Sequence, residues 1–190
     1  MKRDNIRFQA QMTFDDDSIR RMFRAEYYTY ETLQRTIRFV IGVAGVLAAM
    51  FLDIATAPRV LFLMVGLWML IAGDFPSKVQ AEGVIEKRGG RSSCVRYQLD
   101  GAGIQIEKNG RIPYERLDKL VYDDAYLYLF VNRQNGVMIP LEGLSPKDPE
   151  RLKAQIEAAS GKAFKRLSGG IMEYNIRDLF QLWDNRKKTR

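Results

Sequence analysis

The chain has 190 residues and a formal net charge of +7, with a single cysteine, Cys94, and no histidine. The lack of histidine excludes Ser–His and Cys–His nucleophile pairs and imidazole metal ligands, and a lone cysteine excludes an intrachain disulfide. The phosphate-binding glycine motifs GxxxxGK[ST] and GxGxxG do not occur. We therefore expect no catalytic, cofactor-binding or metal-binding residues, and no cofactor.

Residues 1–38 are predicted to form a strand followed by an amphipathic helix. Apolar and polar side chains alternate over residues 6–12, which is typical of a half-buried strand. The run DDDS at residues 15–18 supplies start signals for the helix, and a divalent-cation site is the weaker interpretation of its aspartates. Tyr27, Tyr28 and Tyr30 leave two alternatives open: an aromatic belt at a membrane interface, or packing on a folded domain.

Residues 39–75 are predicted to form a helical hairpin inserted in a membrane. The runs 39–52 (FVIGVAGVLAAMFL) and 60–73 (VLFLMVGLWMLIAG) contain no charged side chain. Each run covers about 21 Å as a helix, against about 30 Å for the hydrocarbon core of a bilayer. Neither has the polar stripe of a soluble helix, which argues against a hairpin buried in a soluble core. Gly42, Gly45 and Gly66 are candidate helix-packing positions.

Basic residues flank the two apolar runs, whereas the connecting loop contains only Arg59. Because cytoplasmic flanks carry the excess of lysine and arginine, we expect two spans in the cytoplasmic membrane of a bacterium, with both termini cytoplasmic. Candidate contacts to lipid headgroups are Arg35, Arg38, Lys78, Lys87, Arg88 and Arg91. The alternative is that these residues only set topology and solubility. No nucleic-acid partner is expected, because the basic residues flank apolar runs instead of forming a separate basic face.

Residues 76–164 are predicted to form a β-rich cytoplasmic domain. Strand-like runs cover residues 79–87, 94–99, 104–108, 111–114, 120–122, 126–131 and 137–141, with Asn109-Gly110 as a hairpin turn. The N-terminal strand at residues 6–12 can join this sheet, so that the hairpin interrupts a single folded unit.

A helix is predicted to close this domain. Asp148 supplies a cap and Pro149 the first helical position, and Gly161 ends the helix. Its inner stripe is Leu152, Ile156 and Ala159. The expected fold is that of an α+β membrane protein, with a two-helix transmembrane hairpin and a curved antiparallel sheet or small barrel capped by this helix.

Residues 165–190 form a basic extension with its own pattern. Ile176, Leu179, Phe180 and Trp183 fall on one face of a predicted helix, and basic residues end the chain. Such a segment can lie on an anionic membrane or dock into a partner, and the alternative is packing on its own domain.

The chain resembles the YcxB-like family of bacterial membrane proteins from the N-terminal strand to about residue 164. The resemblance follows the apolar hairpin, the segment YQLDGAGI at residues 97–104, and Gly110 with IPY at residues 112–114. It continues with LYLF at residues 127–130, MIP at residues 138–140 and the closing helix. It implies a pleckstrin-homology-like domain over residues 76–164 attached to a membrane hairpin, and it supplies no catalytic residues. The C-terminal extension departs from the family pattern.

Together these features predict a membrane-anchored, non-enzymatic binding or scaffold module whose ligand the sequence does not identify. The alternative is an accessory or regulatory subunit of a larger membrane complex that uses the hairpin as its interface. Expected partners are membrane lipid and either a membrane protein or a second copy of the chain. An enzyme is the weakest interpretation, because no spacing brings together the candidate acid–base groups Glu82, Glu86, Asp123 and Asp124.

Overall fold

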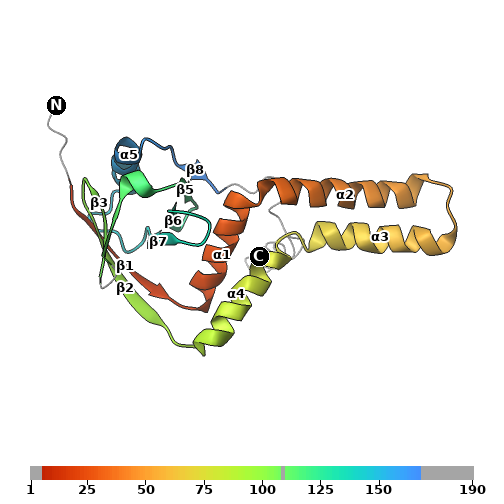
Figure 1. Cartoon of the computed structure of the whole chain (residues 1–190), viewed down its shortest axis with the longest axis horizontal. Coiled ribbons are helices and arrows are strands. Elements are labelled where there is room, and N and C mark those ends of the chain that lie inside the picture. Colours follow the sequence, from red (N-terminus) through yellow and green to blue (C-terminus); the bar gives the residue numbers. More distant parts are fainter. Residues whose placement is uncertain (1–5, 108–109, 168–190) are drawn as a thin grey trace, which may run out of the picture. The chain divides into compact units, whose positions relative to one another are not determined.

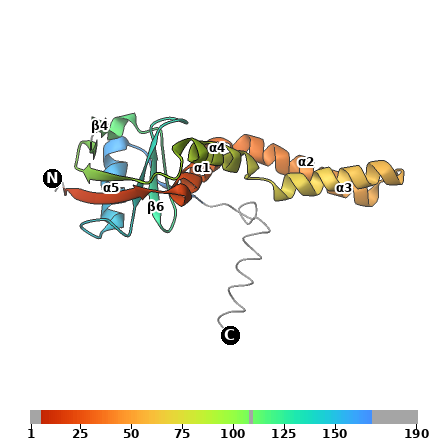
Figure 2. The ribbon, with the colours of Figure 1, turned by 90° about the horizontal axis from the view of Figure 1, so that it is seen from below.

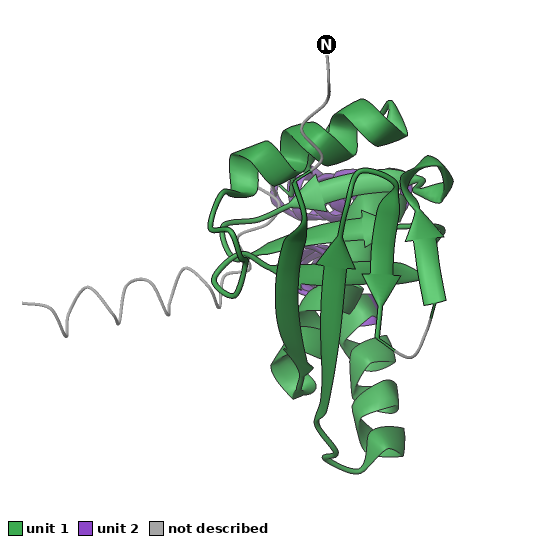
Figure 3. Ribbon diagram, turned by 90° about the vertical axis from the view of Figure 1, so that its left-hand side faces the viewer, with its two compact units in different colours: residues 1–30, 77–167 green, residues 31–76, 168–190 purple. Residues whose placement is uncertain are grey.

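The computed structural model describes residues 6–107 and 110–167, and the chain divides into two compact units. Unit 1 comprises residues 1–30 and 77–167, and unit 2 comprises residues 31–76 and 168–190, so unit 2 interrupts unit 1 in the sequence. The fold is α+β, with five α-helices and two sheets in the described residues (Figure 1). Both sheets belong to unit 1, which is green in Figure 3.

The first sheet of unit 1 has the strand order β1-β2-β3-β4, and all its pairs are antiparallel. Its strands are β1 (Phe8–Phe14), β2 (Ser93–Leu99), β3 (Gly103–Ile106) and β4 (Gly110–Pro113). β1 pairs with β2 along its whole length, with Phe8 opposite Leu99. The prediction that the N-terminal strand joins the sheet after Pro76 is therefore confirmed. Alternation buries Phe8, Ala10 and Met12 and exposes the glutamines between them.

The second sheet has the order β7-β6-β5-β8, and only the pair of β5 and β8 is parallel. Its strands are β5 (Lys119–Tyr122), β6 (Tyr126–Phe130), β7 (Gly136–Pro140) and β8 (Lys165–Arg166), and the short 3₁₀ helix η1 (Tyr114–Arg116) precedes β5. Apolar side chains of both sheets form one buried core. The segment after β7 is fixed to β1, because the backbone N–H of Gln9 donates to the carbonyl of Ser145 at 2.7 Å and the reverse bond is 2.8 Å.

Helix α5 (Pro149–Ser160) caps the core as predicted. The Asp148 side chain accepts a hydrogen bond from the Arg151 N–H, Pro149 occupies the first turn, and Gly161 ends the helix with φ of 69°. Leu152 and Ile156 are fully buried. Burying each of these two side chains contributes about 1.5–3 kcal/mol, so the inner stripe anchors the helix.

Helix α1 (Asp16–Tyr30) begins at the predicted cap and ends against the second sheet. The Tyr30 ring packs edge-on against the Phe130 ring, with 5.7 Å between the ring centroids. The Tyr30 hydroxyl donates a hydrogen bond to Asp118 Oδ2 at 2.8 Å. Burial, and then this hydrogen bond, raises the pKa of Tyr30 above its ordinary value. Tyr27 is also buried. For these two tyrosines the structure favours packing on the domain over an interfacial belt.

The predicted strand at residues 79–87 is wrong, because this segment lies inside helix α4 (Phe75–Arg88). Helix formers occupy most of it, Lys87 and Arg88 suit the negative end of the helix dipole, and Gly89 ends it with φ of 63°. Ser77 and Ala81, one turn apart, are buried, while Val79 is exposed. A period of four residues therefore replaces the period of two that a strand requires.

The described part of unit 2 is a pair of apolar helices, α2 (Thr32–Phe51) and α3 (Thr56–Ile71). α2 begins seven residues before the first apolar run, so Arg35 and Arg38 lie on the helix itself. The two helices run side by side in both Figure 1 and Figure 2. A linker of four residues, from Leu52 to Ala55, joins them.

Candidate functional site

The helices α2 and α3 expose an extensive apolar surface, which we call the apolar belt. It comprises Leu33, Ile37, Val40, Ile41, Leu47, Met50, Phe51, Val60, Leu61, Phe62, Leu63, Met64, Val65, Leu67, Trp68 and Ile71, all exposed. In α3 the exposed residues follow one another without a break from position 60 to 65, so the apolar surface surrounds this part of the helix. A soluble helix keeps a polar face, and apolar surface of this extent marks a contact with a membrane or another protein.

α2 is long and apolar enough to cross a membrane, and it is the only single helix among the described residues that is. Its 20 residues correspond to about 30 Å, the thickness of a hydrocarbon core. The 16 residues of α3 correspond to about 24 Å. α3 and α4 meet the same requirement only when the two helices are taken together as one span.

All three predicted packing glycines lie where α2 contacts α3. A Cβ atom placed on Gly66 would come within 2.8 Å of the Gly42 carbonyl oxygen, and one on Gly42 within 3.1 Å of the Gly66 carbonyl oxygen. A Cβ on Gly45 would lie 3.3 Å from the Phe62 carbonyl oxygen. Backbones therefore approach closely along this contact, as small residues allow in helix pairs within lipid.

The predicted lipid-contacting basic residues fall into three groups. Arg35 and Arg38 are half-buried on the first turns of α2. Lys78 and Lys87 are exposed on α4, and Arg88, at its end, donates to Ser93 Oγ at 2.8 Å. Arg91 is exposed in the loop between α4 and β2. Because the strand expected at residues 79–87 is a helix, Lys87 and Arg88 are placed by helical and not by strand geometry.

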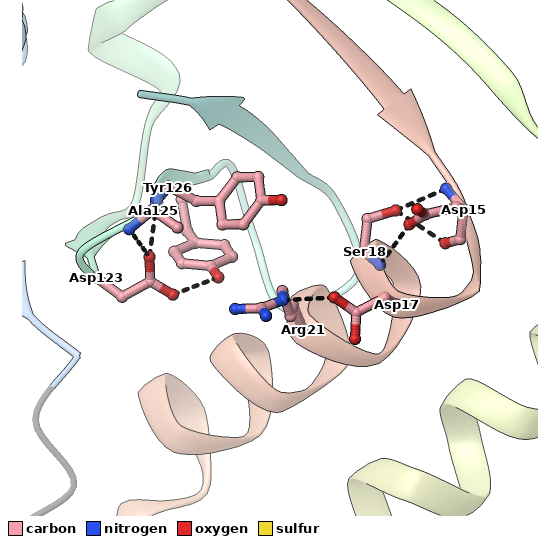
Figure 4. A network of polar contacts seen from close by, with 8 residues as sticks. Asp15, Asp17, Ser18, Arg21, Asp123, Ala125 and Tyr126 are labelled. Carbon is pink, nitrogen blue, oxygen red and sulfur yellow. Dashed lines mark hydrogen bonds and ion pairs between the residues drawn. The ribbon is translucent and has the colours of Figure 1, made fainter. Parts of the chain in front are cut away.

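The aspartates at the start of α1 have structural partners (Figure 4). Asp15 Oδ1 accepts from the Ser18 N–H at 2.9 Å, and Ser18 Oγ accepts from the Asp15 N–H at 2.8 Å. This capping lowers the pKa of Asp15, chiefly through the hydrogen bond from the Ser18 backbone. Asp17 pairs with Arg21 at 2.8 Å. Among the described residues no group of three or more Asp, Glu or Cys side chains is placed to hold a metal ion.

The acidic residues considered as acid–base groups are dispersed and engaged separately. Asp123 accepts hydrogen bonds from the backbone N–H groups of Ala125 and Tyr126 (Figure 4). It also accepts one from the Tyr128 hydroxyl at 2.7 Å. Burial, and then the bond to Asp123, raises the pKa of Tyr128. Asp124 pairs with Arg166 at 2.8 Å.

Glu82 pairs with Arg20 at 2.7 Å and thereby joins α4 to α1. The hydrogen bond from Arg20 is the main cause that lowers the pKa of Glu82. Glu86 is exposed on α4. The structure therefore does not bring the four acidic residues into one arrangement.

The candidate membrane or partner residues Ile176, Leu179, Phe180 and Trp183 lie outside the described residues. Two exposed apolar residues of α4, Phe75 and Val79, were missed as surface candidates, because Phe75 was assigned to the end of the hairpin and Val79 to a strand. Their spacing of four, offset from the small residues Ser77 and Ala81, is the signal that identifies a helix with two different faces.

Comparison with known proteins gives one match. No curated protein and no solved structure matches this chain. The family model for YcxB-like protein matches residues 99–156, a segment that runs from the end of β2 through β7 into α5. The resemblance found in the sequence is confirmed over this segment, which is similar to the YcxB-like protein family.

Proposed function

We propose that this protein is a membrane-anchored, non-enzymatic binding or scaffold module. In this proposal α2 and α3 insert as a hairpin of two spans in a bacterial cytoplasmic membrane, and unit 1 lies at the cytoplasmic face. The apolar belt carries the proposal, because α3 is apolar around its circumference over residues 60–65. Moving each large apolar side chain of the belt out of water is favourable by about 1.5–3 kcal/mol. Insertion would remove this apolar surface from water without requiring a partner protein.

The shorter helix needs an explanation. α3 alone is about 24 Å long, less than the hydrocarbon core. Local thinning of the bilayer offsets a mismatch of this size at modest cost. The close glycine contact supports a hairpin that inserts as one element, because α2 and α3 then share a packed interface inside the lipid.

The architecture of unit 1 supports a pleckstrin-homology-like domain. Four strands form one antiparallel sheet, three further antiparallel strands form the second, and a C-terminal helix seals the core between them. In this interpretation α1, the hairpin and α4 are an insertion between the first and second strands of the domain. Such a domain presents loops and strand edges for binding and needs no catalytic group.

The charge distribution supports the cytoplasmic orientation. The linker between α2 and α3 and the start of α3 contribute one basic residue, Arg59, whereas Arg35 and Arg38 lie at the other end of α2. Lys78 and Lys87 are exposed on α4, and anionic headgroups contribute about 1 kcal/mol per basic residue near the membrane surface.

Thiol accessibility tests this orientation, since the native chain has only Cys94, which is exposed on unit 1. In bacterial spheroplasts, a membrane-impermeant maleimide is expected to leave the native protein unlabelled until the membrane is permeabilised. The matched variant Cys94→Ser with Ala55→Cys carries its thiol in the linker and is expected to label in intact spheroplasts. Labelling of Cys94 from outside contradicts the orientation, and release of the protein by an alkaline carbonate wash contradicts insertion.

The accessory-subunit alternative has less support. It places Gly42, Gly45 and Gly66 at the contact with a partner, whereas these glycines are occupied by the contact between α2 and α3. Purification of the intact protein in detergent separates the two: a stoichiometric membrane partner favours the subunit, and a monomer or homo-oligomer favours the module.

A further inference from the structure

The charged residues of α2, α3 and their linker lie only at the two ends of this helix pair. Between Arg38 and Asp74, Asp53 and Arg59 are the only charged residues in the sequence. Asp53 is exposed in the linker, and Arg59 is exposed in the first turn of α3. We call Asp53 and Arg59 the tip of the helix pair, and Arg38 and Asp74 its base. Charge therefore marks both ends of the apolar surface.

The charge-free zone between base and tip is shorter than an ordinary bilayer is thick. It comprises residues 39–51 of α2 and residues 60–71 of α3, which extend about 20 Å and about 18 Å at 1.5 Å per residue. The hydrocarbon core of a typical bilayer is about 30 Å thick. Leu33 and Ile37 of the apolar belt do not lengthen the zone, because arginines lie among them. Snorkelling arginine stems extend it by only a few Å at each end.

The charged tip disfavours a hairpin that ends inside the hydrocarbon core. If the tip stopped short of the opposite surface, Asp53 and Arg59 would lie among acyl chains, where a charged side chain is costly. The Arg59 guanidinium also donates to the Leu52 carbonyl oxygen at 3.3 Å. This hydrogen bond holds Arg59 beside the end of α2 and satisfies a carbonyl group at the helix terminus. An inserted hairpin therefore requires the opposite surface to lie at its tip, which means a thin bilayer around it.

We propose that the helix pair is matched to a thin bilayer and selects lipids with short acyl chains around the apolar belt. The inference rests on the proposed function, because it assumes that α2 and α3 insert. In a bilayer of ordinary thickness the lipids around the hairpin must compress by several Å, at a cost that rises with each Å of mismatch. Lipids with short acyl chains need no such compression. The protein is therefore expected to gather in thin regions of a membrane, since mismatch sorts proteins among bilayers of different thickness.

Competition among lipids of different chain length at Trp68 tests the proposal. Trp68 is 60% exposed on α3, and Trp183→Phe leaves it as the single tryptophan of the full-length protein. The protein is reconstituted in vesicles of brominated dioleoyl phosphatidylcholine, which quenches tryptophan fluorescence, mixed with a competitor that carries no bromine. The competitors are dimyristoleoyl, dioleoyl and dierucoyl phosphatidylcholine, in order of increasing chain length. We expect dimyristoleoyl lipid to displace the brominated lipid about threefold more effectively than dioleoyl lipid, because the modest cost of mismatch is shared among all lipids around the hairpin.

The outcomes separate this inference from the proposed function. Quenching by the brominated lipid with equal competition from all three lipids overturns the inference and leaves membrane insertion standing. Stronger competition from dierucoyl lipid than from the shorter lipids overturns it as well. If vesicles of pure brominated lipid do not quench Trp68, the apolar belt does not contact acyl chains, and both the inference and the proposed function are contradicted.

A double variant tests whether the charged tip sets the preference. Asp53→Leu with Arg59→Leu removes the only charges between Arg38 and Asp74 and so lengthens the charge-free zone. The preference for dimyristoleoyl lipid is expected to disappear, with dioleoyl lipid competing at least as well. The matched control, Asp53→Glu with Arg59→Lys, keeps both charges and is expected to retain the preference. An unchanged preference in the first variant, once quenching has shown that it inserts, overturns the inference.

Discussion

The two units use apolar side chains in opposite ways. In unit 1, Leu152 and Ile156 of α5 are fully buried, whereas in unit 2 Phe51 is 77% and Trp68 60% exposed. Both units are rich in large apolar residues, although the runs 39–52 and 60–73 of unit 2 contain no charged side chain. The difference lies in the pattern: unit 1 alternates apolar and polar residues and closes a core, and unit 2 surrounds its helices with apolar surface. The apolar side chains of unit 1 are therefore covered by the protein interior. Those of unit 2 are covered, as we propose, by lipid.

The largest expected effect contrasts a buried with an exposed leucine. Leu152→Ala should destabilise unit 1 by about 2–5 kcal/mol, because it leaves a cavity in the core. Leu47→Ala, at a position that is 48% exposed on α2, should leave unit 1 unchanged. Urea unfolding of the detergent-solubilised protein, followed by near-ultraviolet circular dichroism, measures both. Equal destabilisation would show that the units do not unfold separately.

A charge in the apolar belt tests the proposed lipid surroundings. Met64 is 65% exposed. In a membrane, Met64→Arg should oppose insertion by about 2.5–3.5 kcal/mol, whereas on a surface facing water it should change stability by less than about 0.5 kcal/mol. The fraction retained in membranes after a carbonate wash is the readout. Gln98→Arg, on the exposed face of β2, is the control and should be neutral.

A substitution at the glycine contact tests whether α2 and α3 pack closely against each other or merely lie side by side. Gly66→Val should weaken the contact between α2 and α3 by about 1–3 kcal/mol, because its Cβ would meet the Gly42 carbonyl. Gly83 in α4 has no atom within 4 Å of an added Cβ, so Gly83→Ala should instead stabilise that helix by about 0.5–1 kcal/mol. Thermal unfolding in detergent compares the two variants. A neutral Gly66→Val would contradict the packed hairpin.

The smallest effect concerns the cap of α1. Because the folded pKa of Asp15 is lowered, its carboxylate stabilises unit 1 above the unfolded pKa, and this contribution is lost as the pH falls through the folded pKa. Asp15→Asn should flatten the stability profile below about pH 4, where an unperturbed aspartate becomes protonated. Urea midpoints measured across that range provide the test. An unchanged slope would show that the Ser18 bonds do not favour the charged form.

Sequence patterns that extend over only a few residues were sufficient to predict most of the helices and strands. The alternation at β1, the capping groups of α1, and Asp148-Pro149 with Gly161 around α5 each predicted an element that the structure contains. The apolar runs predicted α2 and α3 equally well, and the three glycines predicted to pack helices lie at the contact between them. The failure was α4, where Val79, Val84 and Ile85 suggested a strand although the surrounding residues favour a helix.

Sequence by itself determined the apolar character of the hairpin, the helix caps and the alternation of the strands, because each depends on neighbours along the chain. Tertiary structure decided that α4 is a helix with Ser77 and Ala81 buried and that Tyr30 packs on Phe130. It also decided that Met22, Ile112 and Val131 meet around one cleft. These outcomes depend on residues tens of positions apart, whose packing energy exceeds the small differences in local propensity that a sequence pattern reports.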